Sequence, residues 1–194
     1  MTKFLGFDIA TPLEIEVETD ETFADALSGR RHVQNSGLHR IRLTFNLMDS
    51  FGGFKVASTL QAHRAKQGIG IAFKTEMPQR LGWEKPATVV SCVTGSAYLR
   101  GQTSIRITAA NTTEIEAGGF FNMPGADDKI YEVVEGRRGP GNIVIKPGLL
   151  VPYTGNAALA FDAPMLNCLY DIDRLSRWTG GVINSSRIQL IEAL

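Results

Sequence analysis

One stretch of the chain concentrates side chains that could bind an anion or a charged partner. Between residues 30 and 42 it carries four arginines and two histidines and no acidic residue. Because a guanidinium fits both phosphate and carboxylate groups, this stretch could be a nucleic-acid patch, a phosphate site or a contact surface for another protein. Its basic residues are Arg30, Arg31, His32, His39, Arg40 and Arg42.

An acidic segment precedes the basic stretch and balances its charge. Residues 1–24 hold one lysine and six acidic residues, a net charge of −5, and residues 25–66 hold seven basic and two acidic residues, a net charge of +5. The whole chain has 20 basic and 20 acidic residues. A nucleic-acid-binding domain normally carries an unbalanced basic excess. The balance therefore favours a protein contact over nucleic-acid binding.

Two interpretations of the opposed charges remain open. In the first, acidic and basic side chains meet between neighbouring subunits of a ring, because a head-to-tail contact joins two different faces of the same chain. The predicted interface residues are Glu14, Glu16, Glu18, Arg30, Arg31, Arg40 and Arg42. In the second, the two segments pair with each other across one sheet of a single chain.

The remaining reactive side chains form no pattern of a catalytic or metal site. The three histidines lack ligand spacing, and no G-x-S-x-G motif is present. Cys92 and Cys168 lie in apolar sequence, which predicts buried free thiols. The glycine-rich GRRGPG at residues 136–141 lacks the G-K-[ST] ending of a phosphate loop and is expected at a hairpin. We therefore predict that the chain has no catalytic, cofactor-binding or metal-binding residues and that it is not an enzyme.

The elements that must position these residues are mostly strands. Apolar and polar residues alternate along many short segments, and 20 glycines and 8 prolines punctuate the gaps between them. One segment, residues 55–67, has helical spacing and is followed by Gly68, with Val56 and Leu60 expected against a sheet. Glu21–Leu27 is a weaker helical candidate. Strands are expected around residues 13–18, 41–47, 69–73, 88–93, 104–108, 129–134, 142–146, 157–161, 165–170 and 187–191.

The spacing of strands and turns changes in the middle of the chain. Turns follow every eight to twelve residues there, which is typical of a small, partly open barrel. We therefore predict a mainly β protein of two domains. A β-sandwich or barrel domain with the helix is built from residues 1–87 and 165–194, and an OB-like domain from residues 88–164 is inserted into it.

Several motifs, in their order, resemble those of the distal tail proteins of long-tailed bacteriophages. An early S-G-R stretch leads into an arginine-bearing strand, SGRRHVQNSGLHRIRLTFNL, and a helix runs into an apolar strand that ends at a proline, VASTLQAHRAKQGIGIAFKTEMP. GQTSIRI, AGGFFNMPGADDKIYEVVE, IKPGLL and FDAPMLNCLYD follow in family order. The resemblance covers most of residues 25–194. The short stretch after Trp83 departs from the family pattern.

This resemblance implies a structural protein of the virion. Members of the family form a ring, usually a hexamer, that joins the tail tube to the hub of the tail tip, and their second domain can carry side fibres. The expected partners are therefore copies of the chain itself, a tail tube protein and a hub protein. Alternatives are a tail tube or tube-terminator subunit, or an OB-type module that binds glycans or nucleic acid. Apolar runs far shorter than about 20 residues and the lack of a signal-peptide core predict no membrane contact and synthesis in the cytoplasm.

Overall fold

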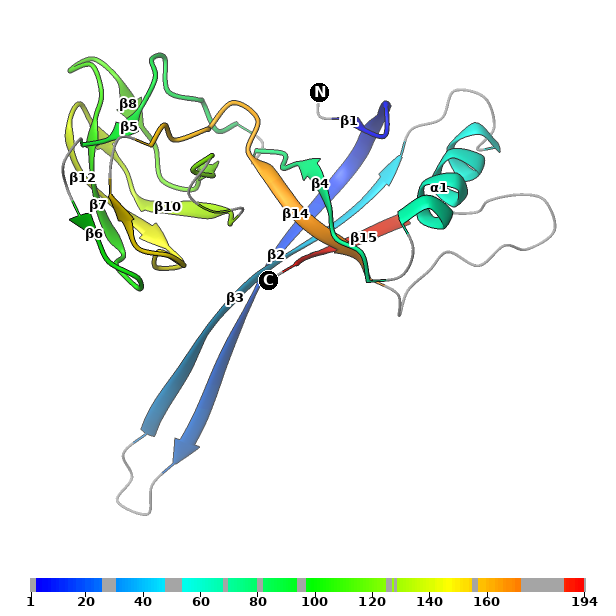
Figure 1. Cartoon of the computed structure of the whole chain (residues 1–194), viewed down its shortest axis with the longest axis horizontal. Helices are drawn as coiled ribbons and strands as arrows, with labels where there is room; N and C mark the ends of the chain where they lie inside the picture. Colours follow the sequence, from blue (N-terminus) through cyan, green and yellow to red (C-terminus); the bar gives the residue numbers. More distant parts are fainter. Residues whose placement is uncertain are drawn as a thin grey trace. The chain divides into compact units, whose positions relative to one another are not determined.

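The computed structural model describes residues 3–25, 31–47, 54–67, 70–79, 82–93, 97–124, 127, 129–154, 157–171 and 187–193 (Figure 1). These residues are mainly β, with one helix among them, which confirms the predicted fold class. The chain divides into two compact units. The first contains Met1–Phe73 and Cys168–Leu194, and the second contains Lys74–Asn167. The sequence placed the borders between the two predicted domains after residues 87 and 164, and that division stays a prediction.

A six-stranded sheet forms the body of the first unit and reaches the border with the second. Its strand order is β1-β2-β3-β15-β14-β4, so the last strand of the chain lies beside the third (Figure 1). Their bounds are β1 Lys3–Phe4, β2 Phe7–Asp25, β3 Arg31–Leu47, β4 Phe73–Glu76, β14 Met165–Tyr170 and β15 Arg187–Glu192.

One face of this sheet is apolar because alternate residues of each strand point to the same side. On β3 the inward residues are Ile41, Leu43 and Phe45, each at most 2% exposed. Leu43 lies opposite Leu190 of β15, so the inward sets of both strands coincide. Burying this face holds together strands that are far apart in the sequence.

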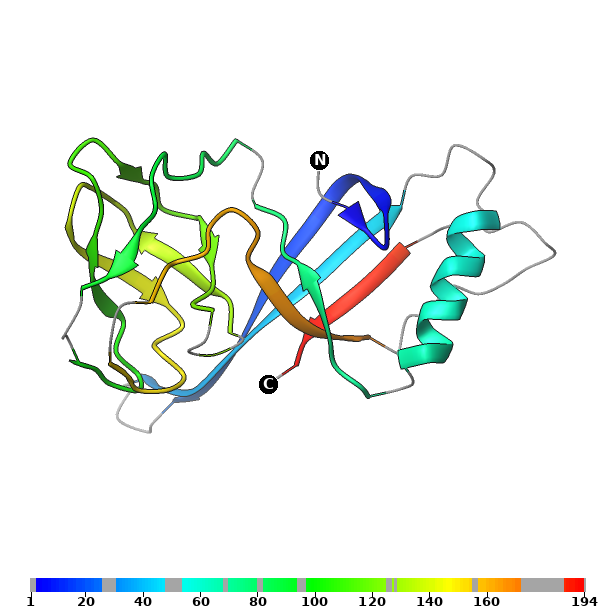
Figure 2. The same cartoon turned by 45° about the horizontal axis from the view of Figure 1, so that its top comes forward.

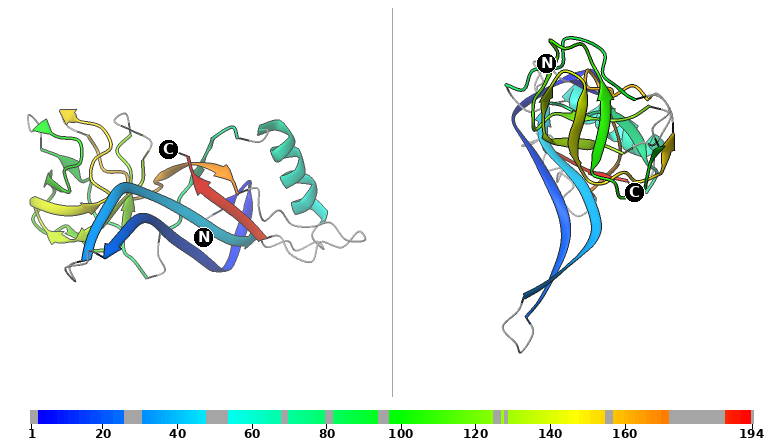
Figure 3. Two further views of the ribbon diagram at one scale, coloured as in Figure 1. Left: turned by 90° about the horizontal axis from the view of Figure 1, so that it is seen from below. Right: turned by 90° about the vertical axis from the view of Figure 1, so that its left-hand side faces the viewer.

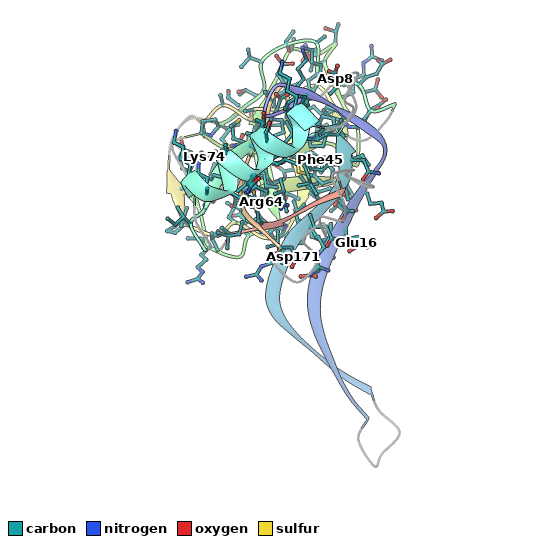
Figure 4. The ribbon with its side chains drawn as sticks, turned by 90° about the vertical axis from the view of Figure 1, so that its right-hand side faces the viewer. Asp8, Glu16, Phe45, Arg64, Lys74 and Asp171 are labelled. Atoms are coloured by element: carbon teal, nitrogen blue, oxygen red, sulfur yellow. The ribbon has the colours of Figure 1, made fainter. Side chains whose placement is uncertain are left out.

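The helix α1, Phe54–Gln67, packs against that face (Figure 4). Leu60 is 8% exposed, as predicted, while the side chain of Val56 lies outside the described part of the chain. The ring of His63 contacts Phe73 edge to face, with the two centroids 5.0 Å apart. The helix therefore contributes both an aliphatic and an aromatic contact to the core.

The second unit is a nearly closed barrel, visible in Figure 2. Its five-stranded sheet has the order β5-β7-β12-β10-β9. Two shorter pairs accompany it, β8 with β11 and β6 with β13. The bounds are β5 Ser91–Cys92, β6 Ala97–Tyr98, β7 Ser104–Thr108, β8 Glu114–Ile115, β9 Phe120–Phe121, β10 Tyr131–Glu135, β11 Arg137–Arg138, β12 Gly141–Lys146 and β13 Tyr153–Thr154.

The segment 157–161 closes the barrel between its two edge strands. On one side, the N–H of Leu159 donates to the carbonyl of Val90 at 2.8 Å. On the other side, the N–H of Ala160 donates to the carbonyl of Asn122 at 2.9 Å. The barrel interior holds Phe121 and Tyr131, both fully buried. The predicted barrel is therefore confirmed, and its OB-like topology stays a prediction.

Two sequence-based expectations are wrong. The candidate helix at Glu21–Leu27 is strand as far as Asp25, because its residues pair with β3 and long-range pairing overrides weak helical spacing. The strand expected at residues 69–73 begins only at Phe73, and Ile71 is 58% exposed. The alternation there includes glycines, which have no side chain to pack on a sheet.

Candidate subunit interface

The predicted interface residues lie on or beside a long two-stranded ribbon formed by β2 and β3. The two strands pair from Ile9↔Leu47 to Asp25↔Arg31. Their outer neighbours are much shorter, since β15 pairs with β3 only between Asn46 and Arg42. Beyond those residues the ribbon continues away from the other strands of its sheet (Figures 1 and 3). We call this outer part, residues 19–25 and 31–39, the arm.

An irregularity in strand pairing marks the base of the arm. Thr19 faces His39, but Glu21 faces Asn35, so a single residue of β2 lies opposite three residues of β3. Extra residues of this kind bend a strand and increase its twist. The ribbon curves as it leaves the sheet in Figure 3. The arm is therefore a directed projection of the first unit.

The two strands of the arm carry opposite charge, and no third described strand pairs with either of them. The β2 segment, residues 19–25, contains three acidic and no basic residues, and the β3 segment, residues 31–39, contains Arg31, two histidines and no acidic residue. In the described sheet, β2 has no outer neighbour beyond Asp8, and β3 has none between residues 31 and 39. Unpaired N–H and C=O groups along such an edge can pair with another strand.

Nearer the sheet body, Arg42 binds three carboxylates of its own chain. Its Nη2 lies 2.7 Å from Oε1 of Glu18, its Nη1 3.7 Å from Oε2 of Glu16, and its Nε 3.4 Å from Oδ2 of Asp171. Glu16 and Asp171 lie on the same side of the sheet in Figure 4. Glu16 is directly across the ladder from Arg42, and Glu18 is the diagonal neighbour.

This cluster shows a contact within one chain for three of the predicted residues. Arg42, Glu16 and Glu18 are ion-pair partners within one chain, as the second interpretation expects, and their place in a subunit interface stays a prediction. The reason is register, since antiparallel pairing of β2 with β3 puts the two charge patterns face to face. Each such pair is partly exposed and contributes about 0–1 kcal/mol.

The other predicted interface residues have different surroundings. Arg40 lies across from Glu18 but, of the described residues, none offers its guanidinium a carboxylate at ion-pair distance. Its side chain is half-buried. Glu14 is exposed and faces Thr44. Arg31 begins β3 at the far end of the arm and its side chain lies outside the described part, as does the whole of Arg30.

Two acidic residues at the base of the ribbon were missed from the sequence. Asp171 completes the Arg42 cluster, and Glu192, only 1% exposed, accepts a hydrogen bond from the N–H of Ile41 at 3.1 Å. That carboxylate continues the β15–β3 ladder by one bond where β15 ends. Glu192 lies on the same side of β15 as the buried Ile188 and Leu190, and no local signal identifies partners so distant in the chain.

The candidate reactive groups elsewhere are protected. Burial raises the pKa of Cys92 to about 11, and burial followed by the Glu192 charge raises the pKa of Cys168 to about 12. Asp127 accepts hydrogen bonds from the N–H of Lys129 and the phenol of Tyr131. Within the described ranges, no three His, Cys, Asp or Glu side chains are grouped to hold a metal ion. The features of this site that could bind a partner are therefore its strand edges and its charged side chains.

The chain matches no model of a known protein family, and no curated protein is detectably similar to it in sequence. No helix in the described part of the chain has the length and apolar character needed to cross a membrane. Evidence for a function must therefore come from the sequence and the structure of this chain.

Proposed function

We propose that this chain is a structural subunit of a long-tailed bacteriophage, of the distal tail type. Copies assemble into a ring, expected to be a hexamer, between the tail tube and the hub of the tail tip. Its place in the virion and its tube, hub and side-fibre partners rest on the family resemblance of the sequence. The structural observation that supports the proposal is the arm.

The arm suits contacts between copies of one chain. Among the described strands, one outer edge of the arm belongs to an acidic strand and the other to a basic strand. A ring requires two different, complementary faces on every subunit, and the two edges of the arm meet that requirement. Arg40, at the base of the basic strand, adds a cation without an ion-pair partner among the described residues.

The alternative of a nucleic-acid-binding barrel has less support. Such barrels stack bases on exposed aromatic side chains. In the second unit Phe120, Phe121 and Tyr131 are fully buried, and Tyr98 and Phe161 are at most 5% exposed. A tail tube subunit would share the sheet and helix, but it has no need of a separate barrel. These comparisons favour the ring-forming role.

The oligomeric state of the purified full-length chain tests the proposal. Light scattering on a sizing column should give a closed oligomer of fixed mass, and negative-stain images should show rings. Replacing Arg31 and Arg40 by glutamate should convert the rings into folded monomers. The β3 segment of one copy would then carry negative charge and repel the acidic β2 segment of the neighbouring copy. A matched control is Arg106→Glu, an exposed position on the barrel.

The assembly that is observed distinguishes the candidate functions. Long tubes would indicate a tail tube subunit instead of a ring. Salt-sensitive binding of oligonucleotides by a monomer would indicate the binding-module alternative. A monomer at all concentrations with neither property would overturn the proposal.

A further inference from the structure

The helix α1 carries positive charge and no negative charge. Its charged and titratable residues are Lys55, His63, Arg64 and Lys66, and it contains no acidic residue. Lys55 and Lys66 are exposed, while Arg64 is half-buried beside the ring of Tyr170. The two lysines are about three helical turns apart, so they project from the same side, roughly 16 Å apart along the axis. With a neutral His63, the two lysines and Arg64 give the helix a net charge of +3.

The helix itself does not account for Lys55. The first turn is the positive end of the helix dipole, where a cation is disfavoured, and no acidic residue accompanies Lys55 there. Lys66, in the last turn, lies at the end that favours a cation. None of the described residues offers a carboxylate at ion-pair distance to either lysine. A partner that the helix does not supply would explain the position of Lys55.

The opposite face of the sheet carries acidic side chains. Alternation along β2 directs Glu14, Glu16 and Glu18 to one side of the sheet. Ile15, between them, points to the other side and lies opposite Leu43, so it shares the face that α1 covers. The three glutamates therefore lie on the side away from α1. Glu14 is exposed, and the side chain of Glu16 is 61% exposed.

The charge and the length of this acidic surface match those of the helix. Arg42 and Asp171 join the glutamates there, and we call this set the acidic strip: Glu14, Glu16, Glu18, Asp171 and Arg42. Its four carboxylates and one guanidinium give a net charge of −3. Glu14 and Glu18 are roughly 13 Å apart along the strand, against roughly 16 Å between the two lysines. Flexible lysine side chains can bridge the difference.

We propose that α1 of one copy docks on the acidic strip of the neighbouring copy. Because it requires a ring, this docking rests on the proposed function, and it adds a second contact to that of the arm. Lys55 pairs near one end of the strip and Lys66 near the other. Two different faces of one chain meet, as a head-to-tail contact requires. Such exposed pairs are individually weak, but they fix the direction in which copies join.

A charge exchange within one chain tests the docking. Lys55→Glu should weaken self-association of the full-length chain about fivefold or more, and Glu14→Lys should do the same. The double variant restores opposite charges at every contact between copies, so it should associate as wild type does. Lys55 and Glu14 lie on opposite sides of the sheet, so this rescue cannot come from a contact within one chain. Sedimentation velocity over a concentration series measures the association.

Matched variants separate the docking from effects on folding. Glutamate is favoured in the first turn of a helix, so Lys55→Glu should be at least as stable as wild type in urea while it associates more weakly. Lys66→Glu should also weaken association. Lys146→Glu makes the same change of charge at an exposed position on the barrel and should associate as wild type.

The outcomes distinguish this contact from the ring itself. Unchanged rings in both lysine variants, or a double variant that does not recover, would overturn the docking and leave the proposed ring standing. A wild-type chain that stays monomeric at every concentration would overturn both.

Discussion

Nδ1 of His63 on α1 lies 2.7 Å from the phenol oxygen of Tyr170 on β14, and this contact joins the helix to the sheet. Burial raises the pKa of Tyr170 to about 12, against an opposing effect of Arg64, so the phenol keeps its proton near neutral pH. The protonated phenol and the imidazole therefore share one hydrogen bond, whose direction follows the tautomer of His63. The Arg64 guanidinium lies 5.0 Å from the centre of the Tyr170 ring.

Acid should weaken the first unit through His63. Burial, and then the charge of Lys66, lower the pKa of His63 in the folded state below its unfolded value of about 6.5. The folded state therefore binds fewer protons, and its stability should fall as the pH drops below about 6.5. Urea unfolding followed by circular dichroism at pH 7 and pH 5 measures this change.

The control is His63→Gln, which can still accept from Tyr170 but does not titrate. It should lose less stability than wild type between pH 7 and pH 5. Equal losses in both proteins would show that His63 does not govern the acid sensitivity.

Leu60 should be a principal anchor of α1. Its side chain is 8% exposed and faces the apolar side of the sheet, so Leu60→Ala removes buried methyl groups and leaves a cavity. The expected loss is about 2–5 kcal/mol in the free energy of unfolding. Denaturant titration gives the value, with the exposed Gln61→Ala as control. A loss below about 0.5 kcal/mol, the usual range for surface changes, would contradict the packing.

Substitutions of Arg40 and Arg42 should have different effects, although the two residues are only two positions apart. Arg42→Gln removes three ion pairs within the chain and should lower the free energy of unfolding by about 1–2 kcal/mol. Arg40→Gln removes no described ion pair, and its stability should stay within about 0.5 kcal/mol of wild type. Arg40→Gln should instead weaken self-association. Chemical denaturation and sizing of both variants compare the two effects, and the reverse pattern would be inconsistent with the assigned partners.

Both thiols should be unreactive in the folded chain. With the pKa of Cys92 at about 11 and that of Cys168 at about 12, neither forms appreciable thiolate at pH 8. Because the thiolate is the nucleophile, iodoacetamide should label the native protein far more slowly than the protein in denaturant. Mass spectrometry of timed samples follows both sites. Rapid labelling of native Cys92 would show that the barrel opens around this residue.

Local periodicity by itself determined most of the elements and their inward faces. Alternation at residues 41–47 and 165–170 identified β14 and the body of β3, and helical spacing identified α1 to within one residue. The apolar setting of both cysteines likewise predicted their burial. These features depend on neighbours within a few residues, because side-chain direction repeats every two residues in a strand and about every 3.6 in a helix.

Only the tertiary structure decided which elements meet. The strand character of Glu21–Asp25 follows from pairing with β3, and the partners of Arg42 follow from the register of β2 and the end of β14. Segment 157–161 closes the barrel by bonding to Val90 and Asn122, and Gln79 donates to the carbonyl of Phe161. Register and closure join residues far apart in the chain, and a one-residue shift would change every partner. Local spacing contains no such information, so these contacts arise only when the whole chain folds.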